Sequence, residues 1–327
     1  MIKVRVARGL KRHHATLAAF IILIIFFSIL LPDTFPTGRN LFNISQQVSM
    51  LAVTAFAMTI VMAMGDYDLS VGSMASLAGI GVALLYKITG SEIASLLMML
   101  SIGLICGWFN GLLVSYLNIL PFVATLGSLT MFSGLAFLIS GGKTIFGAAI
   151  PAGFSNFARN GLSIAHVGDY TVAIPNLTLL AFILLILTWF ILQKMVFGRH
   201  LYAIGGNKEA ARLAGVDVKQ VRLIAFMLSG LGATIAGLMY MSRVSSANPT
   251  QGAGLMLDAI AAVFIGMTMN EQNEPRVFNT LIGVLFLGIL SNGLTQLSVD
   301  SYVRDILVGG LIIISVAANR IGNRAEA

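Results

Sequence analysis

Charged residues are scarce in this chain: they make up 10% of its 327 residues, against about 25% in a soluble globular domain. Hydrophobic residues account for 57%. Such a chain has too little polar surface to cover a soluble core, and its net charge of +7 is explained by membrane topology without a nucleic-acid partner. The composition therefore predicts an integral membrane protein in contact with membrane lipid and no nucleic acid.

The sequence also lacks the residue patterns of catalytic and metal sites. Its single cysteine, Cys106, lies in an apolar run, and its four histidines show no metal-ligand spacing. Gly141–Thr144 resembles the end of a phosphate-binding loop, but Phe137 stands where that motif needs a glycine. We therefore expect no enzymatic activity, metal or cofactor on this chain.

Long apolar runs make up most of the sequence. A helix of about 20 apolar residues is long enough to cross a bilayer. They predict a single all-α transmembrane domain over 15–318, between a basic N-terminus at 1–14 and a C-terminal tail at 319–327. The ten expected spans are 15–31, 44–64, 69–86, 93–117, 121–140, 174–193, 222–242, 256–270, 277–297 and 303–318.

The distribution of Lys and Arg orients these spans. Because cytoplasmic loops are enriched in cations, the basic start and the basic segment 194–222 are both expected inside. Alternation then puts both termini in the cytoplasm, and the loops 32–43, 141–173 and 243–255 outside. The first span could be mistaken for a signal peptide, but no small-residue cleavage site follows Leu31, so we expect it to be retained.

The one long polar segment inside the apolar chain runs from Gly198 to Arg222. Its middle, Glu209–Gly215, is rich in strong helix formers and ends at a glycine, which predicts a short helix with a glycine C-cap. A short helix held outside the membrane by two spanning helices is a surface that a cytoplasmic partner can bind.

Two carboxylates, Asp66 and Asp68, lie where apolar helix should turn or continue. A charge at membrane depth costs about 2.5–3.5 kcal/mol on insertion scales. One interpretation is a broken helix lining a transport path, with Ser70 and Ser73 offering hydroxyls. The other is a loop at the cytoplasmic rim in which Asp68 or Ser70 caps the next helix. Asp258 either caps the eighth span or faces the same cavity.

Further candidate pathway residues follow Pro121, which is well placed in a first helical turn. Phe122 offers an aromatic face to a sugar ring, and Thr125 and Ser128 offer hydroxyls. Most such hydroxyls in spanning helices bond only their own backbone.

A short sequence similarity relates the two halves of the chain. Asn110–Leu112 near the end of the fourth span matches Asn292–Leu294 near the end of the ninth, and Asp68 corresponds to Asp258. Units that are five spans apart have opposite orientations in the membrane, so this similarity predicts inverted repeats. The alternative is a chance match in a chain rich in Gly and Leu.

Gly103, Gly107 and Gly111 recur every four residues in the fourth span. Small residues at this spacing let two helix backbones approach closely. We therefore expect a helix contact along this stripe, with no ligand.

Taken in order, several motifs resemble those of the permease subunits of bacterial ATP-binding-cassette sugar importers, in the group of ribose, galactose, xylose and autoinducer-2 transporters. The resemblance covers about residues 38 to 318. The matching segments are Asp68–Ser73, Pro121–Gly127, Gly198–Asn207, Glu209–Ala211 with Gly215, Ser246–Thr250, Leu257–Val263 and Asn292–Leu294.

This resemblance implies a ten-helix permease in the bacterial inner membrane. It would pair with a second copy or a paralogue, two cytoplasmic ATPase domains that hold ATP and Mg, and a periplasmic sugar-binding protein. The coupling segment would be 198–217. Its expected contact residues with the ATPase are Asn207, Glu209, Ala210, Ala211, Arg212 and Gly215. The expected substrate pathway comprises Asp66, Asp68, Ser70, Ser73, Phe122, Thr125, Ser128, Asp258 and Asn292.

Two departures from the family pattern bear on which sugar is bound and on the inner gate. Asp66 replaces the second glycine that usually precedes the Asp-Leu-Ser motif, and 266–275 replaces a Gly-rich turn. Two other functions stay open. One is an importer of nucleosides or branched-chain amino acids, and the other is a secondary transporter whose acids bind a coupling ion.

Overall fold

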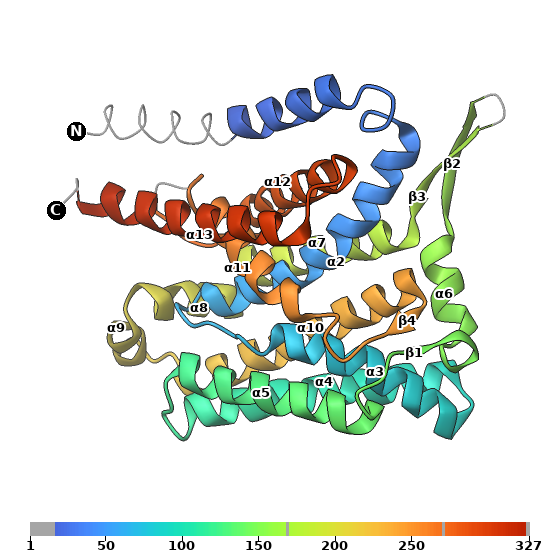
Figure 1. Cartoon of the computed structure of the whole chain (residues 1–327). Helices are drawn as coiled ribbons and strands as arrows, with labels where there is room; N and C mark the ends of the chain where they lie inside the picture. Colours follow the sequence, from blue (N-terminus) through green and yellow to red (C-terminus); the bar gives the residue numbers. More distant parts are fainter. Residues whose placement is uncertain (1–16, 168–169, 270–271, 325–327) are drawn as a thin grey trace.

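The computed structural model describes residues 17–167, 170–269 and 272–324, and within them it is almost entirely helical (Figure 1). A first helix spans Leu17–Leu30. The other long helices are α2 (Gly38–Met62), α3 (Val71–Thr89), α4 (Glu92–Ser115), α5 (Pro121–Ser140), α7 (Asn176–Gln193), α10 (Val218–Val244), α11 (Ala253–Met267), α12 (Val277–Gln296) and α13 (Ser301–Arg324).

A helix lies at each of the ten predicted spans. Among the described residues, seven of these helices are long and apolar enough to cross a membrane: α2, α3, α4, α5, α7, α10 and α12. Leu17–Leu30 and α11 are shorter apolar helices. α13 covers the tenth predicted span, 303–318. The prediction of an all-α integral membrane protein is confirmed.

The short elements gather at opposite ends of the bundle (Figure 1). At one end lie α8 (Val196–Gly206) and α9 (Lys208–Leu213), on the same side as the start of the first helix and the end of α13. At the other end, β1 (Ile145–Phe146) pairs with β4 (Ser246–Ala247), and α6 (Ala152–Arg159) follows a 3-10 turn, Gly147–Ala149. This arrangement matches the predicted alternation of loops.

An antiparallel hairpin that was not predicted follows α6. β2 (Gly161–Val167) pairs with β3 (Tyr170–Pro175), with an irregularity between Ser163 and Ala165. This bulge breaks the alternation of apolar and polar residues that would otherwise indicate a strand. For 141–173 we predicted an external loop with room for a short interfacial helix, which α6 matches, but no strands.

Helix packing relates the two halves of the chain as the predicted inverted repeats require. The first repeat is the first helix through α5, and the second is α7, α10, α11, α12 and α13. α4 packs on α10 as α12 packs on α2, and α3 packs on α5 as α11 packs on α13. α2 and α10, equivalent helices of the two repeats, pack against each other at the centre. The pairings favour a true repeat over a chance match.

The glycine stripe of α4 forms its contact with α10. A Cβ at Gly107 would lie 2.3 Å from the Phe226 carbonyl oxygen, and one at Gly111 would lie 2.9 Å from the Leu223 Cα. Only glycine therefore allows the two backbones to approach this closely, as small residues do in membrane helix pairs.

Candidate functional site

The backbone is interrupted between α2 and α3. α2 ends at Met62, Gly65 takes a left-handed φ of +83°, and α3 begins only at Val71. Asp66, Asp68 and Ser70 in this segment are buried. Irregular backbone at membrane depth is tolerated only inside protein or along a cavity. This geometry favours the broken-helix interpretation over a loop at the rim.

Asp68 is the centre of a hydrogen-bond network that ties three helices together. Its Oδ1 accepts from the Ser70 amide at 3.0 Å and hydroxyl at 2.6 Å, and its Oδ2 accepts from the Ser229 hydroxyl of α10 at 2.7 Å. Asn110 of α4 donates to the Ser70 hydroxyl at 2.8 Å. Ser70 occupies the N-cap position of α3, but its side chain makes no capping bond to the helix.

Asp66 forms an ion pair with Arg222, in the second turn of α10. The Asp66 Oδ2 lies 2.8 Å from Nε and 2.7 Å from Nη2 of Arg222, and both side chains are largely buried. A buried carboxylate without this partner would be strongly destabilising. The extra charge that the sequence carries at position 66 is thus neutralised within the chain.

A second interruption precedes α11 and approaches the first. α10 ends at Val244, the next residue Ser245 turns the chain with a φ of +54°, and α11 begins at Ala253. A Cβ at Gly72, in the first turn of α3, would lie 2.6 Å from the Gly252 carbonyl oxygen. The Gly252 amide donates to the Ser76 hydroxyl at 2.8 Å. Equivalent helices of the two repeats therefore meet at their N-terminal ends.

A cavity of about 190 Å³ lies where these two helix starts face α5. Four hydroxyl groups line it, those of Ser73, Ser76, Ser133 and Thr250, together with apolar side chains. The remaining lining residues are Leu69, Gly72, Leu129, Pro249, Ala253 and Met256. Discontinuous helices of two repeats that meet around a small cavity are the arrangement in which transporters hold a substrate.

The predicted pathway residues do not all lie together in the structure. Ser73 lines the cavity. Thr125 bonds to the Tyr67 carbonyl at 3.3 Å, next to the Asp68 network. Ser128 is buried, Phe122 is 58% exposed on the outer face of α5, and Asn292 exchanges hydrogen bonds with Asn40 at 3.1 Å.

Asp258 does not cap its helix, so the capping interpretation is wrong. α11 begins at Ala253, three residues before the predicted start of the span, which leaves Asp258 in the second turn. Its Oδ2 accepts from the Arg304 Nη2 of α13 at 3.0 Å. Asp258 therefore joins α11 to α13 instead of facing the cavity.

Sequence reasoning missed three of the four hydroxyl residues of the cavity, Ser76, Ser133 and Thr250. Ser76 was the most accessible to prediction, because it follows Ser73 by three residues and so lies on the same helix face. Thr250 follows Asn248–Pro249, a turn signal that marks the second interruption. Ser133 carries no local signal of its own.

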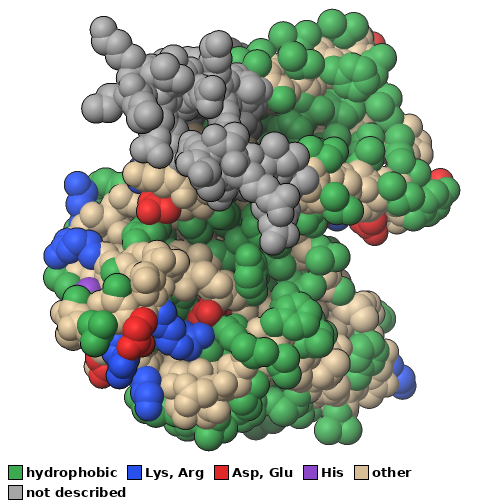
Figure 2. All heavy atoms as spheres, turned by 90° about the vertical axis from the view of Figure 1, so that its left-hand side faces the viewer, with side chains coloured by type: hydrophobic (Ala, Val, Ile, Leu, Met, Phe, Trp, Pro, Cys, Tyr) green, Lys and Arg blue, Asp and Glu red, His purple; other side chains and the backbone are tan. Residues whose placement is uncertain are grey.

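The predicted coupling helix is present as α9, which is exposed except for Ala211. Asn207 caps it, accepting from the Ala210 amide at 3.0 Å, and Gly215 turns the chain after it with φ +89°. Arg212 hydrogen-bonds Glu209, which lowers the pKa of that exposed carboxyl below its usual range. Leu213 is 77% exposed. Lys and Arg side chains surround this end of the molecule (Figure 2).

α8 connects α9 to the interrupted segment between α2 and α3. A Cβ at Gly205 would lie 2.4 Å from the Ala63 carbonyl oxygen, directly after α2. The Tyr202 hydroxyl donates to the Pro275 carbonyl at 2.8 Å, before α12. A displacement of α9 would therefore reach the ends of α2 and α12 through α8.

The comparison with known proteins agrees with this geometry. A family model described as the permease component of branched-chain amino acid transport systems matches residues 40–316. The chain belongs to this permease family. It is 36% identical to the ribose import permease protein RbsC of Bacillus subtilis, covering 91% of this chain and 90% of that one.

Other relatives have related descriptions. The chain is 35% identical to the ribose import permease protein RbsC of Escherichia coli K12, covering 92% and 91% of the two chains. It is 32% identical to the D-allose transport system permease protein AlsC of the same strain, covering 94% and 91%. These proteins are described as sugar permeases although the family model is described by amino acid transport.

Proposed function

We propose that this chain is the membrane permease subunit of an ATP-driven importer and forms the translocation path for a monosaccharide or similar small polyol. The main observation in support of this proposal is the hydroxyl-lined cavity at which the two interrupted segments meet. Hydroxyls placed in an apolar wall can exchange hydrogen bonds with a polyol and orient it. The sugar relatives support the same substrate class.

The cavity favours a sugar over an amino acid. Among the described residues, its lining holds no charged side chain. The carboxylate and ammonium of an amino acid would lose their hydration there without an ionic partner, which is costly. A neutral polyol has no charge to desolvate there and can donate hydrogen bonds to the hydroxyl oxygens, since those of Ser73, Ser76 and Thr250 already donate within the chain.

The three acids considered for binding a coupling ion give little support to ion-coupled transport. Asp66 pairs with Arg222, Asp258 pairs with Arg304, and Asp68 accepts three hydrogen bonds. A coupling proton or sodium ion would have to displace these partners. Energy input through α9 requires no such exchange.

The proposed assembly follows from the exposed surfaces. The α9 end, with its apolar tip at Leu213 and basic surround, would dock on one of two cytoplasmic ATPase domains, which would hold ATP and Mg. A second permease copy or paralogue would pair with this chain in the membrane, and a periplasmic sugar-binding protein would deliver substrate to the α6 end. The membrane is then a bacterial inner membrane, with both termini cytoplasmic and no catalysis on this chain.

Uptake into liposomes tests the proposal. The chain reconstituted with its ATPase and binding protein should accumulate radiolabelled monosaccharide only when ATP is present. The chain alone should accumulate none on a proton or sodium gradient. Sugar accumulation by the chain alone would refute ATP-driven transport, and ATP-driven uptake of an amino acid instead would refute the substrate class.

A further inference from the structure

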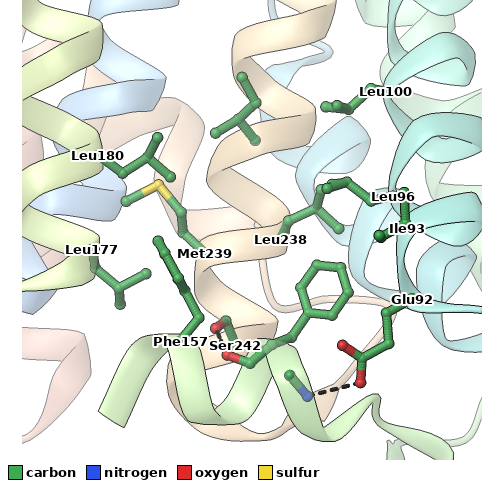
Figure 3. A pocket seen from close by; sticks show the side chains of 13 residues that line it. Glu92, Ile93, Leu96, Leu100, Phe157, Leu177, Leu180, Leu238, Met239 and Ser242 are labelled. Carbon is green, nitrogen blue, oxygen red and sulfur yellow. Dashed lines mark hydrogen bonds between the residues drawn. The ribbon is translucent and has the colours of Figure 1, made fainter. Parts of the chain in front are cut away.

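A larger groove, separate from the hydroxyl-lined cavity, lies between α4, α7 and α10 (Figure 3). Its volume is about 450 Å³. Leu96 and Leu100 of α4 face Leu177 and Leu180 of α7 across it, and α10 forms its floor. α6 closes one end, so the groove lies in the half of the bundle next to α6.

The polar groups at this end are engaged in holding α6. The Glu92 carboxylate accepts from the Gly153 amide at 2.8 Å, in the first turn of α6, and Ser242 donates to the Phe154 carbonyl. The remaining lining side chains are apolar. Apolar cavities of this kind do not retain water, because a water molecule needs several polar partners.

The groove is continuous with the apolar outer surface of the bundle. Next to it, Ile93 and Leu97 of α4 are 71% and 58% exposed, and Phe182 and Ile183 of α7 are 60% and 61% exposed. In a membrane protein these surfaces contact lipid chains. From Ile93 to Leu100, α4 rises by about 10 Å at 1.5 Å per residue, which lies within one leaflet of a hydrocarbon core of ~30 Å.

From this shape, depth and chemistry, we propose that the groove binds an acyl chain of a phospholipid from the leaflet on the α6 side. The lipid fills the space between α4 and α7 and supports the underside of α6. This site is independent of the transport path. Its occupant is therefore a structural lipid and not cargo.

Native mass spectrometry of the purified full chain tests this site. The parent protein should retain one phospholipid per chain through detergent washes that strip the surrounding lipid. Leu100→Trp on α4 and Leu180→Trp on α7 each fill the groove, and each should lose that lipid. Met98→Trp is the matched control, because Met98 is 45% exposed and lies on the face of α4 opposite to Leu96 and Leu100.

The two groove variants lie on different helices, so misfolding of one leaves the other as the test. Folding is checked for each variant by its melting temperature and elution as a single species. Equal lipid retention in the parent, both groove variants and the control would overturn the proposal, and so would a parent stripped of all lipid. Copurification of a small hydrophobic protein that Leu100→Trp displaces would also overturn it.

Discussion

Asp66 and Arg222 neutralise each other where neither side chain has ready access to bulk water. Removing one partner leaves an uncompensated charge, whereas removing both leaves only a packing change. Arg222→Ala should therefore destabilise the protein by about 3–5 kcal/mol. The measurement is the apparent melting temperature in detergent.

Combining Asp66→Gly with Arg222→Met should recover most of that loss, since the double variant removes both charges of this pair and leaves neither partner unpaired. Lys219→Ala, an exposed cation one turn earlier on α10, is the control and should stay close to the parent. A double variant as unstable as Arg222→Ala would show that the pairing with Asp66 is not what Arg222 contributes.

The hydroxyl-lined cavity can be filled from α5. Ser133→Leu adds an apolar side chain to the wall and removes a hydroxyl, and a loss of about 1.4 kcal/mol in sugar binding corresponds to a roughly tenfold loss of uptake at limiting sugar. ATP hydrolysis by the assembled importer should persist, because α9 is unchanged. Thr130→Leu, on the exposed face of the same helix, should leave uptake intact. Normal uptake in Ser133→Leu would remove this cavity from the pathway.

At the level of whole elements, hydropathy predicted ten helices well because the bilayer imposes one length and one composition on them. The interruption at Asp66 and Asp68 was recognisable because carboxylates stand out in an apolar chain. The second interruption, at 245–252, carries no charge, so the sequence did not distinguish it from an ordinary external loop. α8 was also missed, because its basic residues concealed the helical spacing of Phe197, Leu201 and Ile204.

The turn after α9 sets the position of the coupling helix. Gly215 has a φ of +89°, and a β-branched residue there would be strained by about 1–3 kcal/mol. Gly215→Val should leave membrane insertion intact but lower the sugar transported per ATP hydrolysed by several fold. The assay measures both rates in the same liposomes.

Gly206→Ala provides the comparison on the other side of α9. A Cβ at Gly206 meets open space and the backbone there does not need a positive φ, so the coupling ratio should not change. An unaltered ratio in Gly215→Val would mean that the geometry of this turn does not transmit the energy of ATP.

For the whole molecule, the predicted repeat is reflected in packing more clearly than in sequence. Asn110 and Asn292 occupy equivalent positions on α4 and α12, yet they bond different partners, Ser70 and Asn40. The two repeats therefore share the packing of their helices, but the side chains at equivalent positions make different contacts. The meeting of Gly72 and Gly252 depends on this three-dimensional relation, which is why no local pattern revealed it.

The sidedness of the molecule decides between energy input from the cytoplasm and any other scheme. Leu213 on α9 and Phe146 on β1 are 77% and 72% exposed and lie at opposite ends of the bundle. In a Cys106→Ser background, Phe146→Cys should react with a membrane-impermeant maleimide on intact spheroplasts. Leu213→Cys should react only after the membrane is opened. Labelling of Leu213→Cys from outside would put α9 out of reach of any cytoplasmic ATPase, because a helix on the outer surface cannot contact a protein that stays inside.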